Sequence, residues 1–407
     1  MRRRILSVIA LIALFSSLSG CRKLSTELSD MLIIQAIGID KTDEGYNVSI
    51  QALNPAQSGT SEEGSGNTGG NSSTKTYITQ GKSISEAVRS VGTMSGKVPL
   101  YAHNRVIIFG EETARQGITE MMDFFVRDYG MRATVFVAVA KDGKAEDIIK
   151  ASLSKNSISA KVIQSAIKSA HDESKSLQVR VLDVVNATQD ATSNIFMPAL
   201  SLKKSEDDSG GGSSGGGSGG ESQESVLELS DTAVFDKENK LKFFLNEERS
   251  RALGFMADEV KAGNIIFELE DGAVVTLLLV RSNTKTKLSL EDDLPVYNIY
   301  IDMRCDITEY ESKDFSTLTQ ETILTIRDAA QKTAQQKLKD VIKACAGDNA
   351  CDVFGFGRKL WLAEPEYYRQ NLERWEEILP EIKTQINVRC TIRRIGEEAY
   401  FENSKQS

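Results

Sequence analysis

The sequence predicts an α+β fold in several domains, with mixed sheets packed against helices. At 407 residues the chain is long enough for about two to three domains. Apolar residues make up 40% of it and charged residues 26%, which are ordinary values for a globular protein. Segments with the two-residue period of strands and segments with the period of helices both occur, without the regular alternation of a doubly wound sheet.

Residues 1–20 have the features of a signal peptide that ends at a lipid attachment site. Three arginines at positions 2–4 precede an uncharged apolar run at residues 5–15. That run has the length of a signal-peptide core and is too short to cross a bilayer as a helix. Leu18-Ser19-Gly20-Cys21 then resembles the lipobox of bacterial lipoproteins. We therefore expect cleavage before Cys21, lipid attachment to its sulfur, and a chain held at a membrane by acyl groups.

Two low-complexity tracts divide the chain. Residues 58–73 are rich in Gly and Ser, and we expect a surface loop there. Residues 204–225 form a second Gly/Ser-rich tract, with the composition of a linker. The expected units are the signal peptide (1–20), an N-terminal α+β domain (21–203), the linker (204–225) and a C-terminal α+β region (226–407), with the alternative that this region comprises a small middle domain (226–285) and a C-terminal domain (286–407).

The N-terminal domain is expected to begin with a β-hairpin. Residues 32–40 and 46–53 have strand character, and Thr42-Asp43-Glu44-Gly45 between them is a turn sequence. Residues 83–94 then carry apolar side chains at helical spacing, and Ser83 with Glu86 forms a capping box. The elements expected after it are a buried strand at 106–110, a helix at 111–129, a strand at 133–140 and a mostly helical stretch at 147–185.

The C-terminal region combines strands with one long helix. Residues 318–346 place apolar side chains on one stripe, which indicates a helix. Residues 386–395 alternate apolar and polar residues and are expected to form the last strand. Further strands are expected at 230–235, 265–267, 274–280 and 297–308.

Charge and motif content argue against several classes of function. The formal net charge of −9 argues against nucleic-acid binding, which needs a basic face. The two histidines, His103 and His171, have no cysteine or acidic cluster beside them, so no zinc site is expected. Two G-x-S-x-G matches, at 211–215 and 216–220, lie inside the Gly/Ser tract, without the strand and helix of a nucleophile elbow. We therefore expect no enzyme activity, no metal and no cofactor.

Four cysteines follow Cys21. Cys345 and Cys351 are close enough in sequence for a disulfide that closes a small loop at the end of the long helix. Cys305 and Cys390 lie in strand-like segments and would pair if those strands are neighbours. Four cysteines outside the membrane permit disulfides in three connectivities, and buried free thiols are the alternative.

A series of motifs in a fixed order carries a resemblance to a known family. After the lipobox come Gly38-Ile39-Asp40, Gly81-x-Ser83-x-x-Glu86-Ala87, Tyr101-Ala102-His103 before Val106-Ile107-Ile108-Phe109-Gly110-Glu111, then Asp352-Val353-Phe354-Gly355-Phe356-Gly357 and Trp375. In this order and spacing they resemble the Ger(x)C lipoprotein family, the C subunits of bacterial spore germinant receptors. The resemblance covers nearly the whole chain after the signal peptide. The two Gly/Ser tracts are longer than the family pattern, and Cys21-Arg22-Lys23 lacks the acidic or aromatic residue expected after the cysteine.

The resemblance implies a non-catalytic, lipid-anchored subunit on the outer face of the spore inner membrane. It would act with two integral membrane partners, the A and B subunits, in a complex that responds to nutrients. It implies a mixed α+β fold in several domains. The runner-up hypothesis is a lipid-anchored solute-binding protein that feeds a transporter, which would have two α/β lobes around a ligand cleft.

Four residues of the C-terminal motifs are candidates for contact with a partner subunit. They are Asp352, Gly355, Gly357 and Trp375. For the first three the alternative is a turn after the long helix, in which glycine permits a positive φ. For Trp375 the alternative to an interface anchor is packing inside the domain.

Overall fold

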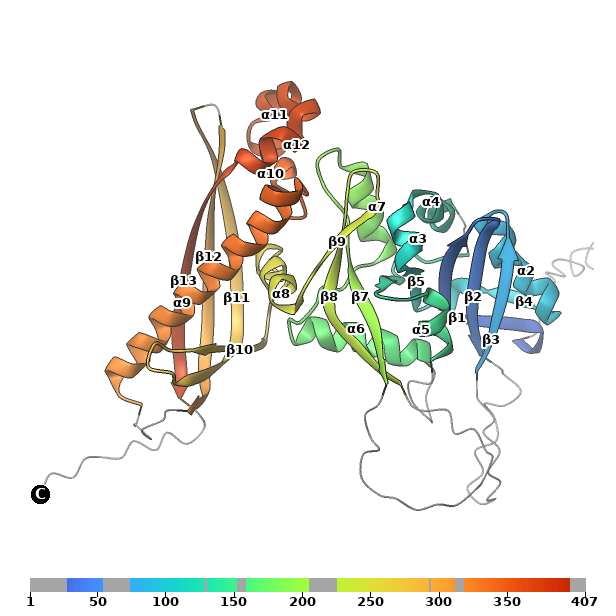
Figure 1. Cartoon of the computed structure of the whole chain (residues 1–407), viewed down its shortest axis with the longest axis horizontal. Coiled ribbons are helices and arrows are strands. Elements are labelled where there is room, and N and C mark those ends of the chain that lie inside the picture. Colours follow the sequence, from blue (N-terminus) through green and yellow to red (C-terminus); the bar gives the residue numbers. More distant parts are fainter. Residues whose placement is uncertain are drawn as a thin grey trace, which may run out of the picture.

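The computed structural model describes residues 28–53, 74–127, 130–151, 159–204, 225–292, 294–311 and 318–395. Its elements form two sheets in an elongated molecule, with helices packed on both (Figure 1). The fold is α+β, with mixed sheets and a long C-terminal helix, as the sequence predicts. Cys21, the signal peptide and residues 58–73 lie outside the described residues, and what the sequence predicts for them stays a prediction.

The larger sheet is built from the first nine strands. They are β1 (Met31–Thr42), β2 (Gly45–Leu53), β3 (Thr74–Gly81), β4 (Val98–Leu100), β5 (Val106–Gly110), β6 (Phe136–Ala140), β7 (Phe196–Lys204), β8 (Ser225–Phe235) and β9 (Leu241–Leu245). Their order is β3-β2-β1-β5-β6-β7-β8-β9, with β4 paired to β1. The predicted hairpin is confirmed, because β1 and β2 pair antiparallel with Thr42 opposite Gly45. β1, β5, β6 and β7 run parallel at the centre.

Helices cover both faces of this sheet. They are α2 (Ile84–Ser95), α3 (Glu111–Gln116), α4 (Thr119–Arg127), α5 (Ala145–Lys150), α6 (Ser159–Asp172) and α7 (Val181–Gln189). Alternate residues of β5 divide between two cores: Ile107 and Phe109 pack with α2, α4 and α7, whereas Val106 and Ile108 pack with α5 and α6. Burial on both faces explains why β5 and β6 are continuous apolar runs.

Helix starts and breaks follow local residues. Ser83 caps α2 as predicted, since its Oγ accepts a hydrogen bond of 3.2 Å from the Glu86 N–H. The single helix predicted over 111–129 is wrong, because the chain divides into α3 and α4 at Gly117, whose φ is +111°. The stretch at 147–185 is likewise divided, into the end of α5, α6 and the start of α7.

The Gly/Ser-rich tract joins two strands of the same sheet. β7 and β8 pair antiparallel, with Lys204 opposite Ser225, so the two ends of the tract lie side by side. β9 pairs with β8 and completes the sheet. The predicted linker at 204–225 is therefore a hairpin connection in the structure, and the larger sheet continues to Leu245. Composition indicates a stretch without packing, but it does not reveal whether the strands at its two ends pair.

The second sheet and its helices form the C-terminal part. The elements are α8 (Glu247–Met256), β10 (Gly263–Glu268), β11 (Val274–Glu291), β12 (Leu294–Glu311), α9 (Gln320–Ile342) and β13 (Lys383–Ile395). The strand order is β10-β11-β12-β13, with β12 and β13 parallel. A middle domain at 226–285 is not formed, because β8 and β9 belong to the larger sheet and β11 to the smaller one.

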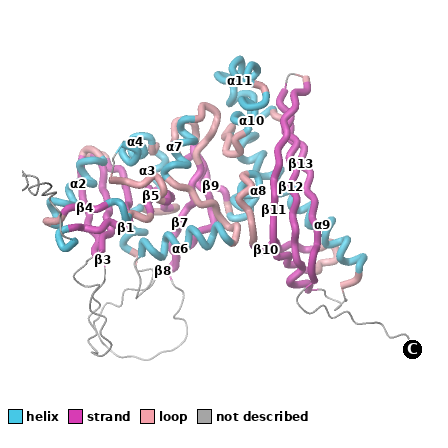
Figure 2. The backbone as a smooth tube through the Cα atoms, turned by 180° about the vertical axis from the view of Figure 1, so that it is seen from behind, coloured by secondary structure: helices cyan, strands magenta, loops and turns pink. Residues whose placement is uncertain are grey.

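Helix α9 packs on one face of the smaller sheet, whose strands lie uncovered in the view of Figure 2. It continues through a π-helical turn, Lys343–Gly347, into the segment that returns to the sheet through α10 (Phe356–Ala363), α11 (Pro365–Asn371) and α12 (Trp375–Ile378). Short 3-10 turns lie at Leu28–Asp30, Tyr101–His103, Leu372–Arg374 and Leu379–Glu381. In the described part of the chain, no helix has both the length and the apolar character needed to cross a membrane.

Candidate functional site at the junction of the two sheets

A buried aspartate links the two halves of the molecule. The Asp352 carboxylate accepts hydrogen bonds from the N–H groups of Phe354 at 3.2 Å, Phe356 at 2.9 Å and Gly357 at 2.7 Å. Its own N–H donates to Asn194 Oδ1 at 2.7 Å, and its carbonyl accepts from the Asn194 N–H at 2.9 Å. The Asn194 Nδ2 donates to the Phe235 carbonyl at 3.1 Å. The loop after α9 is thereby fastened to strands β7 and β8 of the larger sheet.

The electrostatics of Asp352 fit a structural role. Its side chain is fully buried, and this burial raises the pKa of the carboxyl group. The three N–H donors and the nearby Lys359 oppose that rise. The Lys359 ammonium, which donates to the Phe354 carbonyl at 2.7 Å, has its pKa lowered by burial. The three N–H groups and Lys359 thus hold the loop around the carboxylate.

Of the other C-terminal candidates, Gly357 and Trp375 are buried and Gly355 is partly exposed. Gly355 has a φ of +66°, as the turn hypothesis requires. A Cβ on Gly357 would lie 2.3 Å from the Thr192 side chain, so only glycine allows this close approach. Trp375 is 2% exposed. Asp352, Gly357 and Trp375 are buried in this chain, which favours the alternatives of a turn and of packing inside the domain. Contact of these residues with a partner subunit stays a prediction.

A cavity of about 840 Å³ lies between α8 and β10, next to α9 and the end of α6. Its floor is apolar, with Phe255 from α8 and Leu338 from α9, and the partly exposed Ile266 of β10 lies at its rim. Arg251 spans it, donating to the Ser174 carbonyl at 3.1 Å and to the Asn264 carbonyl at 2.6 Å. Lys337 pairs with Glu248 at 2.8 Å. Because these cations are already paired, the cavity offers an apolar floor rather than converging acid and base groups.

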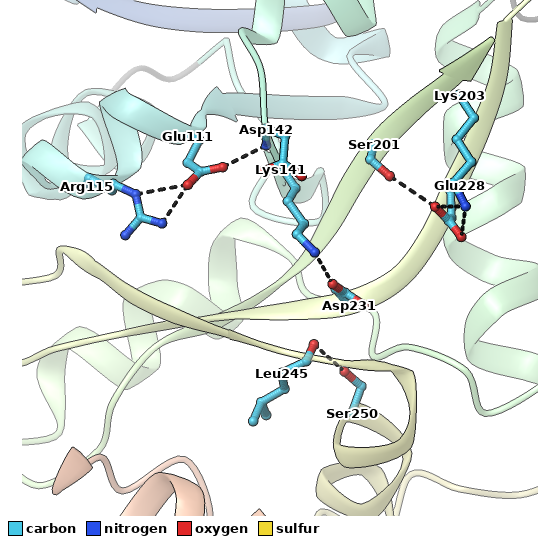
Figure 3. A network of polar contacts seen from close by, with 10 residues as sticks. All are labelled: Glu111, Arg115, Lys141, Asp142, Ser201, Lys203, Glu228, Asp231, Leu245 and Ser250. Atoms are coloured by element: carbon cyan, nitrogen blue, oxygen red, sulfur yellow. Dashed lines mark hydrogen bonds and ion pairs between the residues drawn. The ribbon is translucent and has the colours of Figure 1, made fainter. Parts of the chain in front are cut away.

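A polar network on the larger sheet likewise uses its charges internally (Figure 3). Lys141 Nζ pairs with Asp231 at 2.5 Å, and this hydrogen bond is the main cause of the raised pKa of Lys141. Glu111 accepts from the Asp142 N–H at 2.7 Å and from Arg115. The network ties β8 and α3 to the end of β6. In the part of the chain that the structure describes, no cluster of His, Cys, Asp or Glu is placed to bind a metal ion.

The four cysteines of the C-terminal half are buried free thiols in this structure. The Cys351 N–H donates a hydrogen bond of 2.8 Å to the Cys345 carbonyl, so the two residues are close in the fold. The predicted disulfide between them is not formed. Burial raises the pKa of Cys351 to about 11. Cys305 and Cys390 do lie on the neighbouring strands β12 and β13, where Cys305 is paired with Ile392 and Cys390 with Met303.

Residues that the sequence did not single out complete the junction. Asn194, Thr192 and Arg251 belong to no motif. Asn194 contacts Asp352, 158 positions away, Thr192 lies against Gly357, and Arg251 donates to the Ser174 carbonyl, 77 positions away. The sequence feature that came closest to predicting the junction is the Asp352–Gly357 motif, whose glycines indicate a tight turn.

The fold and the junction define a two-part α+β protein. The family model described as spore germination protein N-terminal domain matches residues 25–202, and the model described as spore germination B3/GerAC like, C-terminal, matches residues 230–396. The chain belongs to the Ger(x)C family of spore germination proteins.

Particular relatives match over nearly the whole chain. Spore germination protein KC of Bacillus subtilis (strain 168) is 24% identical over 97% of this chain and 96% of its own. Spore germination protein GerQC of Bacillus cereus is 22% identical over 93% of this chain and 96% of its own. A solved structure, the crystal structure of the GerBC protein, has a TM-score of 0.56 at 18% identity, with 88% of this chain and 96% of that chain covered. That likeness shows the shared fold.

Proposed function

We propose that this protein is the non-catalytic, lipid-anchored C subunit of a spore germinant receptor and acts in nutrient-triggered germination. The observation that carries the proposal is the match of both family domains, in order, over nearly the whole chain. Relatives that are named spore germination proteins align from end to end with it, which supports a role for the whole chain.

Lipid anchoring at Cys21 is supported by the lipobox and by the apolar run before it. The anchor would hold the protein at the outer face of the spore inner membrane, beside the integral membrane A and B subunits. Confinement to one surface raises the effective concentration of the subunit near its partners, so modest contact surfaces suffice for assembly.

A non-catalytic role is supported by how the buried and paired charges are used. The Asp352 carboxylate binds three backbone N–H groups, and the Asp231 carboxylate pairs with Lys141. A hydrolytic site would need an acid and a base that converge on an open pocket. In the described residues, the cations at the cavity between α8 and β10 pair with carboxylates or with backbone carbonyls instead.

The test is the Cys21→Ala substitution in spores. We expect the protein to leave the membrane fraction and the nutrient response to be lost, because the sulfur that receives the lipid is gone. Ser7→Ala, inside the apolar run of the signal peptide, is the matched control and should change neither readout. Normal germination by spores that have released the protein would contradict the proposal.

A further inference from the structure

The smaller sheet has one face that α9 does not cover. Along β11, β12 and β13 alternate side chains are buried against α9, among them Met303 and Cys390. The side chains between them point the other way and are exposed. Figure 2 shows this face without a helix in front of it.

This exposed face is strongly basic. We call it the basic face and define it by six exposed cations, Arg281, Lys285, Lys287, Arg304, Arg389 and Arg393. Two carboxylates, Asp302 and Asp306, lie among these cations, with Asp302 opposite Arg389 in the register, and Glu309 and Glu311 are exposed near the end of β12. The whole chain has a formal net charge of −9, so positive charge is concentrated here against the overall balance.

Most of these cations are unpaired, and two oppose each other. Arg393 pairs with Asp306 at 3.0 Å. Among the residues that the structure describes, Arg281, Lys285, Arg304 and Arg389 form no ion pair. Arg281 stands directly opposite Arg304 in the strand register, an arrangement of like charges that destabilises a sheet. Folding alone therefore does not account for this charge, whereas an external anionic surface would neutralise it.

The shape and composition of the basic face fit a lipid surface better than a protein. Among the described residues, Arg281, Lys285 and Arg304 line a cavity of about 300 Å³ on this face. Exposed large apolar side chains are few there and lie apart: Tyr300, 43% exposed and lying under Lys287, and Leu278 and Val280 of β11, which are 38% and 37% exposed. The centre of a protein interface is poor in charged residues, whereas clustered Lys and Arg recognise anionic headgroups.

We propose that the basic face docks on the headgroups of anionic phospholipids. The smaller sheet lies at the opposite end of the elongated molecule from β1, with which the described chain begins (Figure 1). A chain tethered through Cys21 would then touch the bilayer at two separated points and lie along it. The proposal rests on the proposed function for the tether alone; the charge of the face does not depend on it.

The experiment measures vesicle binding without the lipid anchor. Purified protein carrying Cys21→Ala is sedimented with vesicles of phosphatidylcholine, with and without phosphatidylglycerol, at low and at high salt. We expect binding only to the vesicles with phosphatidylglycerol, and release by salt because the attraction is electrostatic. The variant R281Q/K285Q/R304Q/R389Q should bind roughly tenfold or more weakly. The substituted side chains are exposed and the like-charge pair of Arg281 and Arg304 is removed, so the unfolding midpoint of the variant should be no lower than that of the parent.

The control variant K161Q/K168Q/K339Q/K343Q removes the same charge from exposed positions on α6, α9 and the π-helical turn. It should bind as the parent does. Failure of the parent to bind anionic vesicles, or equal loss in both variants, would overturn the proposal. Either result leaves the spore experiment with Cys21→Ala unaffected, because that experiment measures anchoring by the lipid.

Discussion

At the residue scale, the motifs that carry the family resemblance hold the fold together. The Asp40 carboxylate accepts from the N–H groups of Ala145 at 2.9 Å and Glu146 at 3.0 Å and so caps α5. A Cβ on Gly110 would lie 2.1 Å from the Asp40 Oδ1, so this position requires glycine. Asp352 does the same at the junction, with three N–H donors. In both places one buried carboxylate organises a backbone turn.

Asp352→Ala tests this account of the junction. The substitution leaves three buried N–H groups without their acceptor, and we expect the free energy of unfolding to fall by about 3 kcal/mol or more. Urea unfolding followed by circular dichroism measures the change. Asp123→Ala, which removes a surface ion pair with Arg127 on α4, is the control and should leave the midpoint nearly unchanged. Equal midpoints for the two variants would refute the structural role.

The sequence predicts which residues are special more readily than what they touch. The Asp352–Gly357 motif was identifiable, and its glycines indicated a turn, but its partner Asn194 lies 158 positions away and has no local pattern. Burial of Trp375 could not be distinguished from an interface role, because the same aromatic residue suits both environments. Contacts between distant segments carry no periodic signal.

At the scale of elements, periodicity predicts type better than extent. The hairpin β1–β2, the strand β5 and the helix α9 lie where the pattern places them. The strand predicted at 274–280 extends to Glu291 in the structure. Its second half has one exposed face, and the polar residues on that face interrupt the apolar run from which the strand is predicted. The break at Gly117 is a backbone feature inside an otherwise helical pattern.

The hairpin connection between β7 and β8 leads to a prediction for this element. Replacement of residues 205–224 by Asn-Gly should preserve the fold, because Lys204 and Ser225 are already paired across the gap. A shorter connection lowers the entropic cost of closing the loop. We therefore expect the free energy of unfolding, measured in urea, to rise by about 1–2 kcal/mol. A scrambled tract of the same length is the control. Loss of folded protein on shortening would mean that the tract joins separate domains.

At the scale of the whole molecule, the two family domains share one sheet. The N-terminal model ends at residue 202 and the C-terminal model begins at residue 230, yet β7 and β8 on either side are hydrogen-bonded neighbours. The Asn194–Asp352 contact joins the two family domains a second time. Helix α8 packs against β8 and β9 of the larger sheet and against β11 of the smaller one. The boundary read from sequence families and the boundary between the sheets are therefore different.

Cleavage within the tract tests that unity. A protease site is placed in residues 205–224, and the cut protein is compared with the uncut chain by size-exclusion chromatography. We expect one peak at the position of the intact chain under native conditions, because the β7–β8 pairing and the junction hold the two pieces, and two species in denaturant. Separation of the pieces without denaturant would show that β8 does not bind them together.

The continuous larger sheet also determines where this protein can be recombined with a relative. A chimera that exchanges the halves at the Gly/Ser tract would place β7 of one protein beside β8 of another, where mismatched residues meet along the whole hairpin. An exchange point after Leu245, past the last strand of that sheet, keeps each sheet of single origin. The structural unit at the amino-terminal end, which is the larger sheet with its helices, is therefore longer than the N-terminal family domain. A chimera that keeps this unit intact is joined just before α8.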